Sequence, residues 1–326
     1  MSVTRQSRVP DLNGAEDDTG RKASARKTLP DKPTRVVAAD VRVWQRVGDV
    51  WRYRELLLSL VRKELKIKYK NSTLGFVWSM LNPMLTLIVY YFVFQVVLHN
   101  GIPQFALYLL CGLLVWNFFS TALPGATQAV VGNAGIVKKV SFPREVLALA
   151  PVGAALFFFG LQALILIAAL LVFGVMPAWS YVPLLIPAVA GLVLFASALA
   201  IFLSAVNVYL RDTQHLLELV LMAWFWGTPI AYQYQLVANR LPAVHLPTWV
   251  FLLNPITPVV ITFQRALYAR PDPVSATGAV IQLLPSNVDL MWYLAPLLGV
   301  IVASGVLYVG ALAVFNRLEG NFAEEL

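Results

Sequence analysis

Long uncharged apolar stretches alternate with short polar and basic segments along the chain after about residue 70. A helix needs about 20 apolar residues to cross the hydrocarbon core of a bilayer, and six stretches are that long. Glu218, in the first turn of the fifth stretch, is their only Asp, Glu, Lys or Arg. The pattern predicts an all-α integral membrane protein with six transmembrane helices. The predicted spans are 75–98, 105–130, 147–174, 182–208, 216–236 and 291–315.

The composition agrees with this pattern, since 59% of the residues are hydrophobic, 13% are charged and the mean hydropathy is +0.69. A water-soluble core of this length could not bury so much apolar surface. The single cysteine, Cys111, lies within a predicted span, so no disulfide framework is expected. His99, His215 and His245 are scattered, with no second ligand at helical spacing, and therefore predict no metal site.

The distribution of Lys and Arg predicts the orientation of the spans. With the N-terminus in the cytosol, all but three of the 25 Lys and Arg residues are internal, including those at 62–70 and 138–144. The three exceptions are Arg240, Arg265 and Arg270. Cytoplasmic loops of membrane proteins carry an excess of positive charge, so both termini are expected in the cytosol. The net charge of +8 then favours anionic lipid head groups, rather than nucleic acid, as the partner.

Residues 248–269 are apolar enough for a seventh span, but three features argue against one. Pro255 and Pro258 interrupt a helix there, and Arg265 would lie inside the bilayer. A seventh span would also place Arg317 outside. We therefore expect re-entrant helices that enter the outer leaflet and return between spans five and six, with their irregular backbone buried against protein.

Residues 1–47 are rich in Arg, Lys, Asp, Ser, Pro and Thr and contain few consecutive apolar residues. Such a segment cannot bury enough surface to offset the entropy of ordering, so a disordered cytosolic tail is predicted. No apolar core follows Arg5 and Arg8, which argues against a signal peptide. A binding arm is the alternative to a solvated tail without a specific partner.

From Asp49 to about Lys70, apolar residues recur at helical spacing with basic residues between them. A basic amphipathic helix of this kind lies in the membrane interface, with its Trp at head-group depth and its lysines toward anionic phosphates. The first span follows with almost no linker, which favours this interpretation over a soluble helix that packs on a partner. The residues expected to define the interface helix are Trp51, Arg62, Lys66, Lys68, Tyr69 and Lys70.

The segment GIVKKVSFPREVL between the second and third spans predicts a short cytosolic helix over 138–147. Pro143 suits a helix start, and Glu145 lies in the first turn, where a negative charge is favourable. Val146 and Leu147 offer an apolar contact. A loop whose positive charge only orients the spans is the alternative.

Four stretches resemble, in the right order, the permease subunits of type-2 ABC exporters for polysaccharides, of the Wzm and teichoic-acid-exporter kind. Together they extend over nearly everything from about residue 50 to the end, and four motifs in register are a specific signal. The stretches are LKIKYKNSTLGFVWSMLNPML at 65–85, SFPREVLALAP at 141–151, NVYLRDTQHLLELVL with WGTPIAY at 207–232, and LNPITPVVITFQRALY at 253–268.

This resemblance implies a function, a location and partners. It implies that residues 48–326 form the transmembrane domain of an exporter that moves a polyprenyl-diphosphate-linked polysaccharide across the bacterial cytoplasmic membrane, for lipopolysaccharide or cell-wall biogenesis. The chain would be a transport permease with no enzymatic activity or cofactor of its own. It would form a homodimer with two ATP-binding subunits, which bind ATP and Mg²⁺.

In the family, the loop between spans two and three is the coupling helix, which docks into a groove of the ATP-binding subunit. The resemblance therefore assigns ATPase coupling to Lys138, Lys139, Phe142, Pro143, Arg144 and Glu145.

The energy source is constrained by what the sequence lacks. No G-x-x-x-x-G-K-[ST] motif occurs, so no Walker loop holds ATP phosphates in this chain. Proton- or sodium-coupled transporters use ionisable groups or broken helices at the bilayer midplane. The spans offer almost no such groups, although Asn82–Pro83 and Pro229 are able to break helices.

Aromatic residues are dense in the first and fifth predicted spans, and Trp224 and Trp226 lie deeper than interfacial anchors do. Aromatic faces stack on sugar rings, and the resemblance implies an aromatic-lined channel between these spans of two subunits. Packing in the core or against lipid is the alternative for each residue. The channel or gate candidates are Phe76, Trp78, Tyr90, Tyr91, Phe94, Trp224, Trp226, Tyr232 and Arg265.

Arg211 and Asp212 lie at the cytosolic end of the fourth span, and Glu218 follows as the fifth begins. Unpaired charge at membrane depth is costly, so these three residues are expected to pair as a structural charge cluster. Contact with a substrate phosphate is the alternative.

Two other function classes remain, a type-2 ABC exporter of a small amphipathic drug and a membrane glycosyl- or lipid-phosphate transferase. A transferase should have paired carboxylates or histidines at an interface, whereas Asp272, Asp289 and His245 are widely spaced. Among O-antigen, teichoic acid and galactan, the Ala-, Val- and Arg-rich composition and the long polar tail favour an actinobacterial cell-wall galactan precursor.

Overall fold

The computed structural model describes residues 48, 50–69, 77–140, 142–270, 272, 274, 278, 280, 282–285 and 288–326. The predicted tail at 1–47 therefore lies outside the described residues. The described part is helical, and its one pair of β-bridged residues is Val274 with Val280. This confirms the all-α class.

Four helices are long and apolar enough to cross a membrane, by length and composition. Each corresponds to one of the predicted spans, because an uncharged apolar stretch of this length satisfies its backbone polar groups internally only as a helix. They are α4 (Phe105–Gly132), α6 (Glu145–Val172), the short η2 (Val182–Leu184) continuing as α7 (Leu185–Tyr209), and α11 (Leu290–Glu319).

The fifth predicted span differs from expectation, and the count of six is not confirmed. Helix α3 (Val77–Tyr91) continues into the π-helix η1 (Phe92–Val97), and together they occupy nearly all of the first predicted span, 75–98. Helix α8 (Thr213–Trp226) has 14 residues, so the boundary predicted at 236 is wrong. Gly227 ends the helix, and the following buried turn contains Pro229, which has no N–H to continue it.

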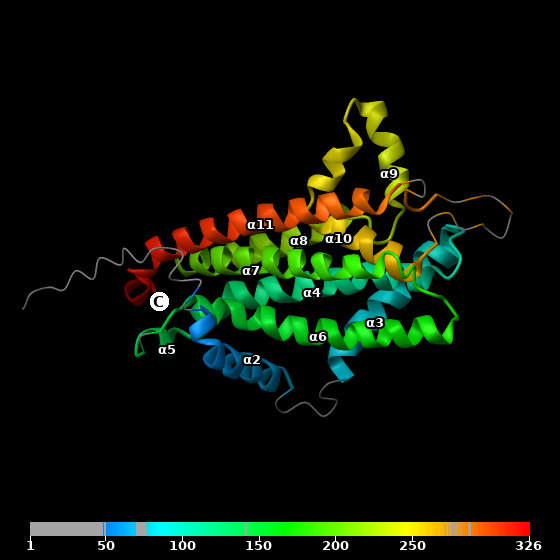
Figure 1. Ribbon diagram of the computed structural model, residues 1–326. Coiled ribbons are helices and arrows are strands. Elements are labelled where there is room, and N and C mark those ends of the chain that lie inside the picture. Colours follow the sequence, from blue (N-terminus) through cyan, green and yellow to red (C-terminus); the bar gives the residue numbers. More distant parts are fainter. Residues whose placement is uncertain are drawn as a thin grey trace, which may run out of the picture. The chain divides into compact units, whose positions relative to one another are not determined.

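The segments predicted to be cytosolic gather at one end of the helices. The short α5 (Ala134–Val137), the turn before α8 and the C-terminal α12 (Phe322–Glu325) lie at the same end in Figure 1. The Tyr209 hydroxyl at the end of α7 donates to the Leu318 carbonyl at 2.8 Å, which ties two of these segments together. The arrangement agrees with the orientation predicted from the Lys and Arg residues.

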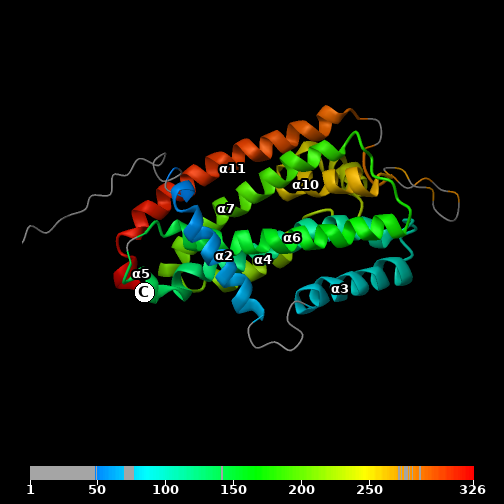
Figure 2. The same ribbon diagram turned by 60° about the horizontal axis from the view of Figure 1, so that its bottom comes forward.

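Helix α2 (Arg54–Tyr69) crosses α6 near the same end, as Figure 2 shows. Its half-buried Leu57 and Leu60 pack against a buried cluster around Leu147 and Phe315. A Cβ atom at Gly153 of α6 would lie 2.7 Å from Cγ2 of Val61, so only glycine permits this close crossing. The apolar face of the predicted interface helix is therefore packed on α6 of its own chain.

The predicted re-entrant segment is broken into short helices. Helix α9 (Tyr234–Arg240) and the 3-10 helices η3 (Leu241–Val244) and η4 (Thr248–Leu253) project from one flank in Figure 1. They are followed by α10 (Ile256–Phe263) and the π-helix η5 (Gln264–Tyr268).

All eight residues of α10 are buried, against α4, α7 and α11. No single helix spans 248–269, and the expected break at Pro255 is confirmed, because η4 ends at Leu253 and α10 begins at Ile256.

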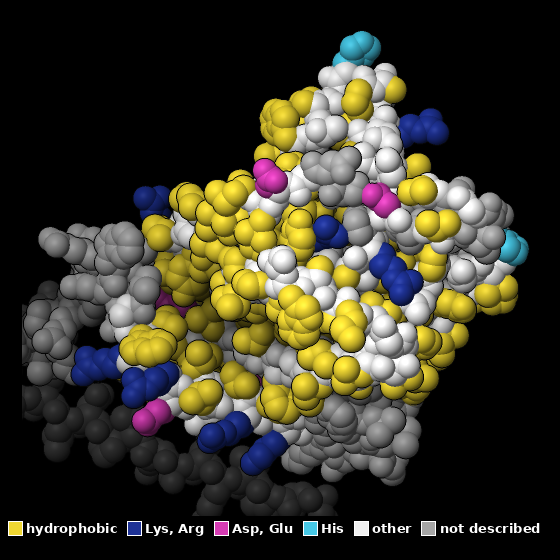
Figure 3. All heavy atoms as spheres, turned by 45° about the vertical axis from the view of Figure 1, so that its right-hand side comes forward, with side chains coloured by type: hydrophobic (Ala, Val, Ile, Leu, Met, Phe, Trp, Pro, Cys, Tyr) yellow, Lys and Arg dark blue, Asp and Glu magenta, His cyan; other side chains and the backbone are white. Residues whose placement is uncertain are grey.

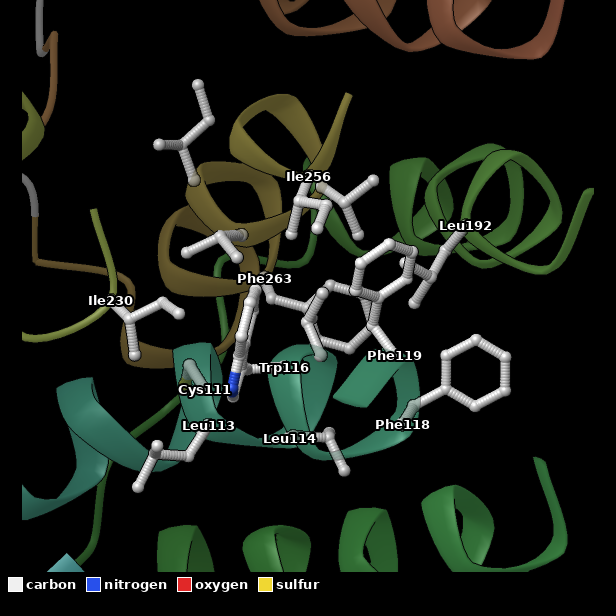
Figure 4. Close-up of a cluster of buried hydrophobic side chains, with 14 of the residues drawn as sticks. Cys111, Leu113, Leu114, Trp116, Phe118, Phe119, Leu192, Ile230, Ile256 and Phe263 are labelled. Atoms are coloured by element: carbon white, nitrogen blue, oxygen red, sulfur yellow. The ribbon is translucent and has the colours of Figure 1, made fainter. Parts of the chain in front are cut away.

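The main core lies around α4. Figure 4 shows side chains of α4, α7 and α10 converging in this core. Phe119 of α4 lies near Leu192 of α7, and Ile256 and Phe263 of α10 point into the same region. The rings of Phe119 and Phe195 stack with centroids 5.6 Å apart. Hydrophobic side chains also cover much of the face in Figure 3, as a surface against hydrocarbon requires. A few charged side chains lie among them and at the edge of this face.

The crossing of α2 and α6 yields a test of the packing. We expect Gly153→Ala to lower the unfolding temperature in detergent, because overpacking costs about 1–3 kcal/mol, whereas Ala normally stabilises a helix relative to Gly. Gly160 of the same helix has nothing within 4 Å of a built Cβ, so Gly160→Ala is the matched control and should be neutral or stabilising. Adding Val61→Ala to Gly153→Ala should restore stability. Equal melting temperatures for the two alanine variants would contradict the close crossing.

Candidate functional site

A groove with a volume of about 300 Å³ lies between α3, α4 and α8. Each helix contributes residues from one of its faces: Thr86 and Tyr90 are four residues apart on α3, and the α8 residues recur at similar spacing. The groove is open on one side. Its lining consists of Thr86, Tyr90, Leu113, Trp116, Asn117, Ser120, Leu221, Met222, Phe225 and Trp226.

Four aromatic rings form one wall of this groove. The Tyr90 ring stacks on Phe225, with centroids 5.4 Å apart and an interplanar angle of 15°. Trp116 and Trp226 each meet Phe225 edge to face, with centroids 5.4 Å apart. Edge-to-face and offset-stacked pairs are the favourable geometries for aromatic rings, so this wall is held in a fixed arrangement.

The predicted channel candidates divide into three groups. Tyr90 and Trp226 line the groove. Trp224 is half-buried and packs against the core instead, because its ring meets Phe119 and Phe195 edge to face and its indole N–H donates to Asn254. The remaining candidates do not line the groove in the described part of the chain. Tyr91 is exposed, and Phe94 packs on Tyr90 and Phe105. Tyr232 lies in the turn after α8, and Arg265 lies over the Tyr181 ring. Phe76 and the side chain of Trp78 lie outside the described residues.

The polar part of the groove was missed by the sequence reasoning. Leu113, Trp116, Asn117 and Ser120 recur at the i, i+3, i+4, i+7 spacing of one helix face and all point into the groove. Asn117 and Ser120 are polar residues inside an otherwise apolar span, and this was a visible signal. The amide of Asn117 donates to the Gln162 Oε1 of α6 at 3.1 Å.

A second cavity of about 280 Å³ lies on the other side of α3, between α3, α4 and α6. It shares Leu113 and Asn117 with the groove, and apart from Asn117 and Gln162 its lining is apolar. Helix α3 therefore separates an aromatic and polar groove from a hydrocarbon-like one.

Asn254 joins the end of α8 to the start of α10. Its Oδ1 accepts from the Trp224 indole N–H at 2.9 Å and from the Ile256 N–H at 3.1 Å. Its Nδ2 donates to the Gly227 carbonyl at 3.1 Å and to the Thr228 hydroxyl at 2.9 Å. One side chain thus holds together two segments that lie 30 residues apart in the sequence.

Arg265, a candidate gate residue, lies in η5 with its guanidinium 4.4 Å from the centroid of the Tyr181 ring. This cation–π contact connects the segment to the turn between α6 and α7. The Tyr181 ring in turn meets Tyr293 of α11 edge to face at 5.5 Å. The geometry assigns Arg265 to packing between outer segments.

The helix predicted at 138–147 does not form as a separate element, and that prediction was wrong. The short helix α5 ends at Val137, upstream of the two lysines, and Pro143 precedes the first turn of the long α6. Lys138 and Lys139 are exposed, Phe142 is half-buried against the neighbouring apolar cluster, and the Glu145 side chain is only 1% exposed.

Arg144 connects this loop to the C-terminal end of α11. Its Nη1 donates to the Glu319 carbonyl at 2.8 Å, its Nε lies 3.6 Å from the Glu319 carboxylate, and its guanidinium lies over Phe322. Phe322 is fully buried and packs edge to face on Phe315. These contacts fasten the loop to the end of α11.

The expected pairing of Arg211, Asp212 and Glu218 is not observed. All three side chains are exposed, and no ion pair joins them within the described residues. Glu218 lies one turn into α8, near enough to the end of the helix for its carboxylate to remain hydrated. Of the described residues, no group of three His, Cys, Asp or Glu is arranged to hold a metal.

The predicted interface helix retains an exposed basic face. Trp51 is 74% exposed and its ring lies 6.0 Å from the Arg54 guanidinium, and Arg62 and Lys66 are also exposed. The side chains of Lys68 and Tyr69, and all of Lys70, lie outside the described residues. Lys63 donates to the Asn133 Oδ1 at 2.6 Å and fastens α2 to the end of α4.

Comparison with known proteins agrees with these features. The family model of the ABC-2 type transporter matches residues 55–268. The O-antigen export system permease protein RfbA of Myxococcus xanthus is 35% identical over 251 residues, covering 76% of this chain and 92% of that protein. Two proteins of the same name from Klebsiella pneumoniae are 30% and 29% identical over 273 residues, covering 83% of this chain and 95% of each relative.

The Arg144 contact predicts a measurable loss of stability. We expect Arg144→Ala to destabilise the protein by about 1–3 kcal/mol, because the partly buried Glu319 carbonyl loses its charged donor. Arg317 lies on the same helix end and is exposed, so Arg317→Ala should change stability by less than about 0.5 kcal/mol. Thermal unfolding of the two purified variants measures the difference. Indistinguishable unfolding curves would show that the Arg144 contact does not hold α11.

Proposed function

The chain belongs to the ABC-2 type transporter family, and we propose that it is the membrane-spanning subunit of an ATP-driven polysaccharide exporter. The substrate is a polysaccharide carried on polyprenyl diphosphate, which moves from the cytosolic to the outer face of the bacterial cytoplasmic membrane. The observation that carries the proposal is the similarity to O-antigen export permeases over most of both chains. An actinobacterial galactan precursor stays a prediction for the individual polymer.

A transport permease of this family requires a separate source of energy. The sequence contains no Walker motif, so ATP and Mg²⁺ are bound by partner subunits. The loop with exposed Lys138 and Lys139 offers those subunits a basic contact surface at the end where α5, the α7–α8 turn and the C-terminus meet. This end is cytosolic in the orientation that the Lys and Arg residues predict.

Two copies of the chain would build the conduit around a two-fold axis, because a groove that is open on one side needs a second wall. The aromatic and polar groove between α3, α4 and α8 supplies the first wall. Aromatic faces suit sugar rings, and the apolar outer faces of α6 and α11 suit lipid.

ATP binding closes the partner subunits and pushes the loop at 138–144 in this proposal. The displacement passes through α6 directly and through the Arg144 contact to α11. Helices α3 and α8 then separate enough for the lipid and the glycan to pass. The short helices around 248–269, fastened to α8 through Asn254, shape the exit.

The exporter is tested by ATP hydrolysis in the assembled complex. This chain and its ATP-binding subunit are purified together in lipid nanodiscs, and turnover is measured with and without polyprenyl-diphosphate-linked glycan. The glycolipid should change the turnover of the wild type. A small amphipathic drug that changes turnover where the glycolipid does not would favour a drug exporter. A chemically altered glycolipid without an ATPase partner would indicate a transferase.

Charge reversal locates the coupling surface in the same preparation. We expect Lys138→Glu with Lys139→Glu to weaken assembly about tenfold or more, because like charges brought together at an interface cost several kcal/mol. Arg240→Glu, an exposed reversal on α9 at the other end, should leave assembly unchanged. Co-purification of the ATP-binding subunit measures the effect. Full assembly of the lysine variant would remove the loop at 138–144 from the docking surface.

A further inference from the structure

We propose that the face of α4 carrying Asn117 and Ser120 is a sugar-binding subsite, which holds one sugar residue of the glycan through hydrogen bonds to its hydroxyl groups. The inference rests on the proposed function and deepens it. The subsite comprises the polar residues of the groove between α3, α4 and α8, which the rings of Tyr90 and Trp226 also line.

The hydrogen-bonding capacity of Asn117 is the first part of the argument. A primary amide has two N–H donors and a carbonyl acceptor, and one N–H of Asn117 donates to the Gln162 Oε1 at 3.1 Å. Among the described residues the carbonyl oxygen and the second N–H have no further partner, so they are available to a ligand beside Asn117. An amide group inside a membrane costs free energy unless it forms hydrogen bonds. A lipid acyl chain has no polar atoms to offer, whereas a sugar has hydroxyl groups.

Gln162 has the role of a positioning residue. It lies on α6, lines the apolar cavity on the other side of α3 and does not line the groove. Its acceptor oxygen fixes the rotation of the Asn117 amide about its side-chain torsions. Ser120, one turn further along α4, adds a hydroxyl that can both donate and accept.

The contrast between the two cavities identifies the occupant. Both are of similar size and both touch Leu113 and Asn117. Apart from Asn117 and Gln162, whose amides meet each other, the cavity toward α6 is lined by apolar residues without an aromatic ring, as suits a hydrocarbon chain. The groove toward α8 combines aromatic rings with Thr86, Asn117 and Ser120, which is the combination that a sugar ring needs: flat apolar faces to stack on, and amides and hydroxyls at its edge.

The volume limits how much glycan is held. About 300 Å³ is at the lower end of the range for small-molecule sites. The groove therefore takes a single sugar residue at a time, and a long glycan would pass it residue by residue.

The test uses the whole complex in nanodiscs of phosphatidylethanolamine and phosphatidylglycerol. The concentration that gives half of the ATPase response is measured for polyprenyl-diphosphate-linked glycan and for polyprenyl diphosphate alone. Asn117→Leu should raise the value for the glycolipid about tenfold, as expected for a lost hydrogen bond in a partly buried site, and leave the value for the carrier unchanged. Ser120→Ala removes one hydroxyl oxygen from a half-buried side chain. It replaces Asn117→Leu in the same measurement if the Asn117→Leu complex does not assemble.

Gln162 provides the readout for positioning. Gln162→Leu should raise the half-response concentration of the glycolipid, whereas Gln162→Glu keeps an acceptor for Asn117 and should stay close to wild type. Ile165→Ala, which alters only the apolar cavity, is the matched control and should not discriminate between glycolipid and carrier.

Each other outcome has a distinct meaning. Unchanged glycolipid responses of Asn117→Leu and Ser120→Ala, beside a responsive wild type, overturn the subsite and leave the exporter standing. An equal shift for glycolipid and carrier also overturns it, because the groove would then bind the carrier. A glycan-specific loss in Ile165→Ala overturns it as a general packing effect. A wild type that responds to neither compound refutes the proposed function itself.

Discussion

The close packing of α4 within the helices around it is the constraint on which the rest of the structure depends. In its most apolar window 72% of the residues are buried, against 28% for α6 and for α11. Lipid is as apolar as the side chains, so helices in a membrane are held together by close contact rather than by the hydrophobic effect. At Gly112 an added Cβ would lie 3.0 Å from Ile230, which shows how closely the turn after α8 approaches α4.

Both ends of the molecule are fastened to this helix or its neighbours by polar contacts. At one end the Tyr108 hydroxyl of α4 donates to the Tyr232 carbonyl at 2.9 Å, and the Tyr268 hydroxyl donates to the Pro103 carbonyl at 2.6 Å. At the other end Lys63 reaches Asn133, and the loop before α6 reaches α11 through Arg144. The groove lies between these ends, on the face of α4 that α3 and α8 only partly cover. In the proposed mechanism, a push at one end would reach the groove through this fastened central helix.

The sequence predicts those features that depend on local composition. Uncharged length identified four spans, the Lys and Arg residues identified which loops share an end, and Pro255 indicated the break before α10. Features that depend on distant contacts were not predictable. The apolar pattern continues past Gly227 to residue 236, so hydropathy gives no sign that α8 ends where its following turn packs on α4.

The same limit explains the errors at the candidate sites. Pro143 does precede a helix start, but the helix is the long α6, since nothing after Glu145 ends it. Arg144 meets Glu319 across 175 residues of sequence, and no local pattern encodes that contact. For the groove, the density of aromatic residues directed attention to Trp224, which packs against the core. The polar pair Asn117 and Ser120 carried the better signal.

Photo-crosslinking in the working complex tests the central claim most directly, namely that glycan passes the groove between α3, α4 and α8. A photoreactive amino acid replaces either Ser120, in the groove, or Ile165, in the apolar cavity, and the complex receives radiolabelled polyprenyl-diphosphate-linked glycan and ATP. The account predicts that radiolabelled glycan becomes crosslinked to the protein at position 120 during turnover, and that little becomes crosslinked at position 165. Glycan attached equally at both positions, or at neither while transport proceeds, would contradict it.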